Sequence, residues 1–411
     1  MTPGARIQAA IEILEGLGAT ALPADRFLRD WFRTRRYAGS KDRAAVAERV
    51  FDIYRHKASY AWRMQSDAPR ALAIASVLAE EGDVAASFDG AGYGPKPLSD
   101  AELTAIAASP GEAPFHVRYE FPEFLEAELG RSLGDSLSTE MAAMQARAPV
   151  DLRVNAFRAS RTDVITRLRQ DGFDAQPTPY ASHGVRIASQ QGLAQLRRHD
   201  AFEQGWFEFQ DEAAQIAASL AGAEPGMRVL DLAAGAGGKA LALAADMKND
   251  GEIIAHDIDT GRLLQIGQRA ARAGITIIRT SDGILPDALF DLVFVDAPCS
   301  GSGTWRRQPE QKWRLTPERL AELIALQDTL LDEAVRVLPG GHLIYATCSL
   351  LRSENEDRIE AFLKRHPEFA AVRTDEAWRG TAPPGLSEFF RATPATTGTN
   401  GFFAAILQRE I

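Results

Sequence analysis

The sequence predicts an α/β protein whose C-terminal half is a doubly wound, mostly parallel sheet. From Gly205 onward, short apolar runs alternate with segments of helical periodicity. Such alternation places helices on both faces of a parallel sheet. We expect strands at 227–234, 251–258, 275–282, 290–297 and 342–349, helices near 238–247, 260–273, 317–338 and 354–366, and a last strand at 402–409.

Length and composition are those of a folded, multidomain chain. The 411 residues suggest about two or three domains. Hydrophobic residues make up 45% of the chain, which argues against disorder. No apolar run reaches the roughly 18 residues of a membrane span, and the N-terminus has helical periodicity where a signal peptide would have a continuous apolar core. With only two cysteines, we expect a cytoplasmic protein without membrane contact.

We place the domain boundaries at three changes of pattern. Residues 1–140 contain only helical patterns, with Ile7, Ile11 and Leu14 on one face of the first helix. Residues 145–205 read as a small α+β unit, because strands at 150–156 and 184–189 flank a helix that Gly172 ends. Residues 206–411 form the sheet domain.

Charge is distributed unevenly along the chain. The net charge of −10 argues mildly against a nucleic-acid partner. Residues 1–70, however, hold thirteen basic against eight acidic side chains, whereas residues 71–140 hold three against thirteen. A local basic face can still bind phosphates.

One basic stretch also carries aromatic residues. Trp31, Phe32 and Tyr37 are interleaved with basic side chains and are able to stack on RNA bases. Equally, the aromatic residues can be core and the cations a solvated face, and the sequence leaves both readings open. The basic residues are Arg26, Arg29, Arg33, Arg35, Arg36, Lys41 and Arg43.

The two cysteines lie at matching positions. Cys299 and Cys348 each follow the end of a predicted strand, and ligands bind at the carboxyl edge of open α/β sheets. A single cysteine beside an apolar strand is more often a small buried hydrophobe. The Ser-Gly-Ser-Gly loop after Cys299, and the acidic residues Glu354, Glu356 and Asp357 after Cys348, favour a reactive site.

Acidic residues end four consecutive strands of the predicted sheet. The first strand runs into the glycine-rich turn Asp231–Lys239, and Asp257 follows the second strand about 20 residues on, where an acid can bind ribose hydroxyls. Asp282 and Asp296 follow the third and fourth strands. Each acid taken singly can be a turn cap. Together they would repel a dinucleotide pyrophosphate, so we expect S-adenosylmethionine, which carries a ribose, an amino group and a positive centre.

At this point the chain resembles the Nop/Sun family of RNA cytosine-5 methyltransferases. It is most similar to bacterial 16S rRNA enzymes with a NusB-like helical N-terminal domain, and the likeness covers nearly the whole chain. It implies a Rossmann-like class I methyltransferase domain preceded by NusB-like and RRM-like units. The matching segments are FEQGWFEFQDEAAQ (202–215), DLAAGAGGK (231–239), HDIDTGRL (256–263), SDG (281–283), DAPCSGSGTW (296–305), KWRLTPERLAELIALQDTLL (312–331), YATCSLLRSENE (345–356) and GFFAAILQR (401–409).

The resemblance implies a role for each site residue. Cys348 would attack carbon 6 of cytosine, Cys299 would assist loss of the carbon-5 proton and enzyme release, Asp296 would bind the cytosine edge, and Lys239 would support Asp296 or the base. No metal is implied. Asp257 would hold the ribose and Asp282 the adenine amino group. The implied cofactor-binding set is Ala233, Ala234, Gly235, Ala236, Gly237, Gly238, Lys239, Asp257, Arg262, Asp282 and Asp296.

The first motif departs from the family form. The usual DLCAAPGGK has Ala233, Gly235 and Ala236 here in place of its Cys, second Ala and Pro. Losing proline frees the loop, so we expect weaker or differently shaped cofactor binding.

Several alternative functions stay open. The expected RNA partner is ribosomal, with transfer RNA as the alternative, and the expected state is a monomer. A DNA cytosine methyltransferase would use the Pro-Cys cysteine as nucleophile, and the second cysteine and the basic helices speak against it. A non-catalytic RNA-binding factor with a degenerate methyltransferase domain remains possible because of the altered loop. A small-molecule methyltransferase would leave about half the chain without a role.

Overall fold

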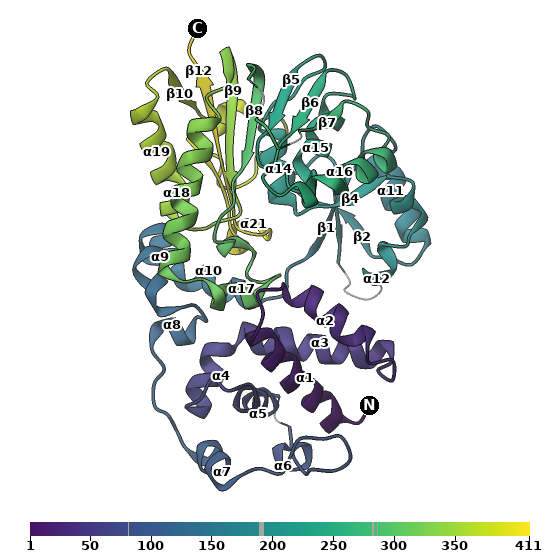
Figure 1. Ribbon diagram of the computed structural model, residues 1–411, viewed down its shortest axis with the longest axis vertical. Helices are drawn as coiled ribbons and strands as arrows, with labels where there is room; N and C mark the ends of the chain where they lie inside the picture. The colour runs from purple at the N-terminus through teal and green to yellow at the C-terminus, as the bar shows by residue number, and fades with distance from the viewer. Residues whose placement is uncertain (81, 189–192, 282, 286) are drawn as a thin grey trace. The chain divides into compact units, whose positions relative to one another are not determined.

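The computed structural model describes residues 1–80, 82–188, 193–281, 283–285 and 287–411. The chain divides into two compact units (Figure 1). A helical unit comprises residues 1–147 and 305–315, and an α/β unit comprises residues 148–304 and 316–411. None of the helices in the described ranges combines the length and hydrophobicity needed to span a bilayer.

The helical unit is built from amphipathic helices around one core. In α1, Thr2 caps the N-terminus and Ile7, Ile11 and Leu14 are buried, as their spacing predicts. The helices are α1 (Pro3–Gly18), α2 (Ala24–Arg33), α3 (Ser40–Arg55), α4 (Lys57–Met64), α5 (Pro69–Ala79), α6 (Val84–Ser87), α7 (Asp100–Ala107), α8 (Phe115–Arg118), α9 (Glu126–Leu133) and α10 (Leu137–Gln145), with 3₁₀ turns η1 (Glu123–Leu125) and η2 (Gly134–Ser136).

Two of the aromatic residues in the basic stretch belong to this core. Trp31 and Phe32 on α2 are buried with ring centroids 5.0 Å apart, so the interpretation that they stack on bases is wrong. Burying the two rings removes a large apolar area from water and so stabilises the fold, and a buried ring is not available to stack on a base. Tyr37 is 69% exposed, and Arg26, Arg33 and Arg36, which precede it in sequence, are also exposed. For Tyr37, base stacking stays a prediction.

A segment distant in the sequence, residues 305–315, completes the helical unit. Helix α17 (Pro309–Arg314) lies beside the N-terminal helices (Figure 1). The Trp313 indole donates a hydrogen bond to the Tyr54 carbonyl at 2.7 Å, and the Ala24 N–H donates to Glu310 at 3.1 Å. Helical periodicity gives no sign of this long-range pairing.

The α/β unit begins with a small antiparallel sheet of order β2-β3-β1-β4. Its strands are β1 (Val150–Val154), β2 (Ala175–Pro177), β3 (Gly184–Ile187) and β4 (Phe207–Phe209), accompanied by α11 (Arg161–Gln170), α12 (Leu193–Leu196) and α13 (Asp200–Glu203). The strands predicted at 150–156 and 184–189 are β1 and β3. β4 pairs with β1 although it lies beyond residue 205.

The large sheet has eight strands within the described residues, in the order β10-β12-β9-β8-β5-β6-β7, with β11 pairing β12. The strands are β5 (Arg228–Asp231), β6 (Glu252–Ala255), β7 (Ile278–Thr280), β8 (Phe290–Asp296), β9 (Val337–Thr347), β10 (Phe369–Val372), β11 (Phe390–Ala392) and β12 (Phe402–Arg409). β5 to β9 pair in parallel, and β12 pairs antiparallel with β9. The predicted mostly parallel sheet is confirmed.

Helices cover both faces of this sheet (Figure 1). Alternate residues of β8 show why: Phe294 packs in the core under α14 and α15, and Val295 packs in the core under α18 and α19. The helices are α14 (Glu212–Ser219), α15 (Gly238–Asp246), α16 (Thr260–Ala273), α18 (Pro317–Glu333), α19 (Glu356–Arg365), α20 (Thr374–Ala377) and α21 (Pro394–Thr397), with 3₁₀ turns η3 (Ser302–Thr304) and η4 (Arg352–Glu354).

The small sheet meets the end of helix α16 at a glycine contact. Gly205 adopts φ +74°, and a Cβ there would overlap the backbone of Arg272 at the end of α16. The Asn155 amide donates hydrogen bonds to the carbonyls of Gly205 (3.0 Å) and Ala273 (2.9 Å). The small sheet is therefore fixed to α16 at a point where only glycine fits.

We predict that Gly205→Ala lowers the free energy of unfolding by about 3 kcal/mol or more, because left-handed strain adds to a backbone clash. Gly222→Ala is the matched control: Gly222 has φ +59° but open space around its Cβ position, so it should cost about 1 kcal/mol. Urea unfolding followed by circular dichroism measures both. Equal losses would show that the contact with Arg272 is unimportant.

Candidate active site

The two cysteine thiols touch. β8 and β9 are parallel neighbours, with Asp296 paired to Ala346. The Ala297 N–H continues the ladder to the Ala346 carbonyl at 2.9 Å. The chains leave the sheet side by side, and the Sγ atoms of Cys299 and Cys348 lie 3.4 Å apart. Both cysteines are free, and each residue is half-buried.

The environment keeps Cys299 protonated. Its hydrogen bond with Cys348 raises the pKa of the Cys299 thiol, and burial and the nearby negative charge of Glu354 raise it further. At neutral pH, Cys299 is therefore a thiol that can donate to the sulfur of Cys348.

Lys239 and Asp296 form an ion pair at the same edge. Lys239 is in the first turn of α15, and its Nζ donates to Asp296 Oδ2 at 2.7 Å. The lysine side chain is only 7% exposed, whereas the aspartate is 36% exposed. The Lys239 ammonium also lies 5.0 Å from the centre of the Phe402 ring. The buried lysine holds Asp296 in place, and the aspartate side chain stays partly exposed, where a ligand can reach it.

The glycine-rich turn is shaped by two left-handed residues. Gly235 and Gly237 have φ of +53° and +81°, and Gly237 is the N-cap of α15. A Cβ on Gly235 would overlap the Arg262 guanidinium, and one on Gly237 would press on Ile266. The guanidinium of Arg262 on α16 therefore packs against Gly235, and its predicted contact with the cofactor stays a prediction.

Asp257 is bound to the same turn. Its Oδ2 accepts the Gly235 N–H and its Oδ1 accepts the Asp259 N–H, both at 2.8 Å. The turn-cap role considered from sequence is therefore real. Each carboxylate oxygen keeps a second lone pair, so Asp257 can also accept from a ribose hydroxyl.

Two arginines restrain the carbonyls of the turn from the other side. Arg269 donates to the Ala236 carbonyl at 2.5 Å, and Arg153 of β1 donates to the Gly238 carbonyl at 2.9 Å. Glu208 of β4, which is 6% exposed, pairs with Arg269 at 2.9 Å. The small sheet thus helps to hold a turn that lacks the family's proline.

The four predicted strand-end acids do not share one environment. Asp231 is fully buried, and apart from a weak interaction with the Ala240 N–H its carboxylate has no hydrogen-bond partner among the described residues. Burial, and then the charge of Asp296, raises the pKa of Asp231 to about 7. Asp231 therefore lies beneath the turn and is out of reach of a ligand. Asp282 lies outside the described residues.

Sequence reasoning missed two exposed apolar residues at this edge. Ile258, directly after Asp257, is 86% exposed, and Leu264 on α16 is 82% exposed. An exposed aliphatic side chain next to Asp257, the residue expected to bind a ribose, can cover an apolar ring of a ligand. The signal in the sequence was an isoleucine immediately following the strand-end acid.

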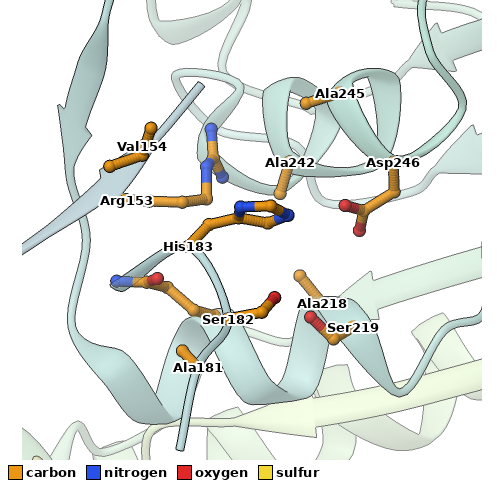
Figure 2. A pocket seen from close by; sticks show the side chains of 11 residues that line it. Arg153, Val154, Ala181, Ser182, His183, Ala218, Ser219, Ala242, Ala245 and Asp246 are labelled. Atoms are coloured by element: carbon orange, nitrogen blue, oxygen red, sulfur yellow. The ribbon is translucent and has the colours of Figure 1, made fainter. Parts of the chain in front are cut away.

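A separate cavity lies behind the turn. Arg153, His183 and Asp246 surround a space of about 20 Å³ between β1, α14 and α15 (Figure 2). This volume holds about one water molecule, so the cavity is too small for a cofactor or a base. Among the described residues, no cluster of side chains suitable for a metal ion is found.

We predict that Asp231→Asn changes how stability depends on pH. The folded pKa is raised, so the stability associated with a protonated Asp231 is present below its unfolded pKa and is lost as pH rises toward 7. The variant's advantage over the parent should grow between about pH 4 and pH 7, by up to about 4 kcal/mol, and then level off. Urea unfolding across this range measures it. A difference that is independent of pH would contradict the buried, protonated assignment.

The comparisons with known proteins agree with this architecture. The family model described as 16S rRNA methyltransferase RsmB/F matches residues 218–408, and a model for the ferredoxin-like domain of these enzymes matches residues 121–194. The chain is 33% identical to ribosomal RNA small subunit methyltransferase B of Erwinia tasmaniensis, over 71% of this chain and 67% of that protein.

Two further matches span different lengths of the chain. A probable ribosomal RNA small subunit methyltransferase B of Synechocystis is 32% identical, over 71% of this chain and 67% of that protein. The crystal structure of PH0851 superposes with a TM-score of 0.79 at 27% identity, covering 100% of this chain and 99% of the other. The chain therefore belongs to the RsmB/F family of 16S rRNA methyltransferases.

Proposed function

We propose that this protein transfers a methyl group from S-adenosylmethionine to carbon 5 of a cytosine in ribosomal RNA through a covalent cysteine–cytosine adduct. The observation that carries the proposal is the 3.4 Å contact between Cys299 and Cys348. Two thiols in contact at the ligand-binding edge suit a reaction that needs one sulfur to attack a ring and a second group to move a proton.

The chemistry explains the need for two sulfurs. Carbon 5 of cytosine is a weak nucleophile. Addition of the Cys348 thiolate to carbon 6 makes carbon 5 enamine-like, so that it can accept a methyl group. The carbon-5 proton must then leave, and the bond between carbon 6 and sulfur must break to return Cys348 as a thiolate. We assign to Cys299 the assistance of these last steps.

Asp296 and Lys239 suit recognition of the base. A carboxylate accepts from the exocyclic amine of cytosine and from the ring nitrogen once it is protonated in the adduct. Buried Lys239 fixes the orientation of Asp296 and balances its charge. The target cytosine must be unstacked before a thiolate can approach its ring, which favours a loop or an end of RNA.

The residues around the turn fit the methyl donor. S-adenosylmethionine supplies an electrophilic methyl group when bound. The turn Ala233–Gly238 would take the methionine end through its backbone, Asp257 the ribose, and Ile258 a face of the adenine. Arg262 packs on the turn at Gly235. The adenine amino group remains assigned to Asp282.

We infer that RNA also contacts the helical unit, domain 1–140 of the sequence interpretation. Arg26, Arg36 and Lys41 are exposed, and no ion pair involves them among the described residues. Exposed Tyr37 lies between them in sequence. Unpaired cations beside an exposed ring can bind phosphates and stack a base. The protein would act as a monomer in the cytoplasm, where its ribosomal substrate is found.

A non-catalytic RNA-binding factor is the second candidate, favoured by the altered first motif. Calorimetry with S-adenosylmethionine separates the two, since such a factor would give neither heat nor a thermal shift. Transfer RNA is the alternative substrate, and bisulfite sequencing of total RNA from a deletion strain decides between the two RNAs.

We predict that Cys299→Ala accumulates a protein–RNA adduct stable to denaturant, because adduct formation proceeds and release fails. Cys348→Ala should form none, because the nucleophile is missing. Denaturing gel electrophoresis with labelled RNA and S-adenosylmethionine detects the adduct. The reverse pattern would exchange the two roles and point to the DNA-type mechanism.

We predict that the pair of changes Arg26→Glu and Arg36→Glu weakens RNA binding and lowers its salt dependence, by about 0.7 in the log–log slope for each phosphate that is no longer bound. Arg118→Glu, an exposed arginine of the same unit paired with Glu112, is the control and should change little. Fluorescence anisotropy at several salt concentrations measures both. Equal effects of the two sets would argue against this surface.

A further inference from the structure

Glu354 is a buried carboxylate that joins the two cysteine loops. Its side chain is completely inaccessible to solvent. From the first loop, the Ser300 N–H donates to Oε1 at 2.7 Å and the Ser300 hydroxyl donates to Oε2. From the second loop, the Ser349 hydroxyl donates to the same Oε2. Ser300 directly follows Cys299, and Ser349 directly follows Cys348.

Gln327 of α18 adds a fixed reference point. Its amide donates to Glu354 at 3.1 Å and to the Pro298 carbonyl at 2.9 Å. Pro298 precedes Cys299, so the first loop is held on both sides of the reactive sulfur. The glutamine is itself fully buried.

The loops are also joined directly. The Ser302 hydroxyl lies 3.1 Å from that of Ser349 and accepts the Leu350 N–H at 2.8 Å. The Gly303 N–H donates to the Cys348 carbonyl at 2.9 Å. Ser349 thus takes part both in this direct contact between the loops and in the contact with Glu354.

A carboxylate removed from water is tolerated only when its lone pairs are filled with good geometry. Each donor to Glu354 therefore has a narrow range of positions. Because the donors are the neighbours of the two cysteines, moving either loop breaks a charge-assisted hydrogen bond. The hydrogen bonds that hold the Glu354 carboxylate therefore also hold the two sulfurs in contact.

We propose that Glu354 is a positioning residue that sets the separation of the Cys299 and Cys348 thiols. It does not touch the reacting base, and it acts through Ser300 and Ser349. Its negative charge has a second, supporting effect, because it strengthens the preference of Cys299 for the protonated thiol. The importance of the thiol separation for methyl transfer rests on the proposed function, whereas the separation itself does not.

The test uses the fact that the chain has only two cysteines. Phenylarsine oxide binds two adjacent thiols at once, so its capture by the full-length protein, without RNA or methyl donor, reports the thiol pair alone. Glu354→Gln keeps the shape, but its amide NH₂ cannot accept from the Ser300 N–H. We expect the capture rate to fall about tenfold or more, while a monothiol reagent still reacts with both cysteines.

Glu356→Gln is the matched control, because Glu356 is also buried in the next turn but pairs with Arg391. It should leave arsenical capture unchanged. If Glu354→Gln fails to fold, Ser300→Ala and Ser349→Ala each remove one arm of the contact and should give a smaller loss. Normal capture by folded Glu354→Gln would overturn the proposal.

The catalytic consequence has its own readout. With RNA and S-adenosylmethionine, Glu354→Gln should lower kcat and the rate of adduct formation by about 100-fold and leave KM for the methyl donor nearly unchanged. If capture falls as expected but the parent protein forms no RNA adduct, the positioning role stands and the proposed function fails. If the parent forms the adduct and Glu354→Gln captures the arsenical normally, the proposed function stands and the positioning role fails.

Discussion

The parallel pairing of β8 with β9 is the constraint on which the rest of this site depends. Two strands in parallel register end at the same edge, so the loops that follow them leave the sheet together. Cys299 and Cys348 are 49 residues apart in the chain, yet their sulfurs are in contact because Cys299 follows the end of β8 by three residues and Cys348 directly follows β9. A slip of one residue in either strand would turn the side chains to the other face.

Charge at this edge is organised in layers. Asp231 is fully buried, and its carboxylate, which has only a weak interaction with the Ala240 N–H, has a raised pKa. The buried Lys239 ammonium pairs with Asp296, balances its negative charge and keeps its carboxylate partly exposed to solvent. Repulsion among these acids is reduced, because the pKa of Asp231 is raised to about 7 and Asp296 is paired with Lys239.

The glycine-rich turn shows how a departure from a family motif is accommodated. Without the proline, backbone restraint comes from side chains: Arg269 and Arg153 bind two carbonyls, and Asp257 binds an N–H. Arg153 comes from the small sheet, so that sheet contributes to the turn's shape as well as packing on α16. Local sequence predicted a freer loop, and tertiary contacts supply the order that the loop lacks.

Hydrophobic period and the order of nearby residues were enough to predict the strand–helix alternation, the carboxyl edge that carries the site and the matching cysteine loops, because these features are local. They were not enough to predict β2, β4, β10 and β11, which are short and draw their stability from neighbours. The burial of Trp31, the place of α17 in the helical unit, the sealing of Asp231 and the bridging role of Glu354 emerge only in the folded chain. Burial and hydrogen-bond partners depend on residues distant in sequence, and no local pattern encodes them.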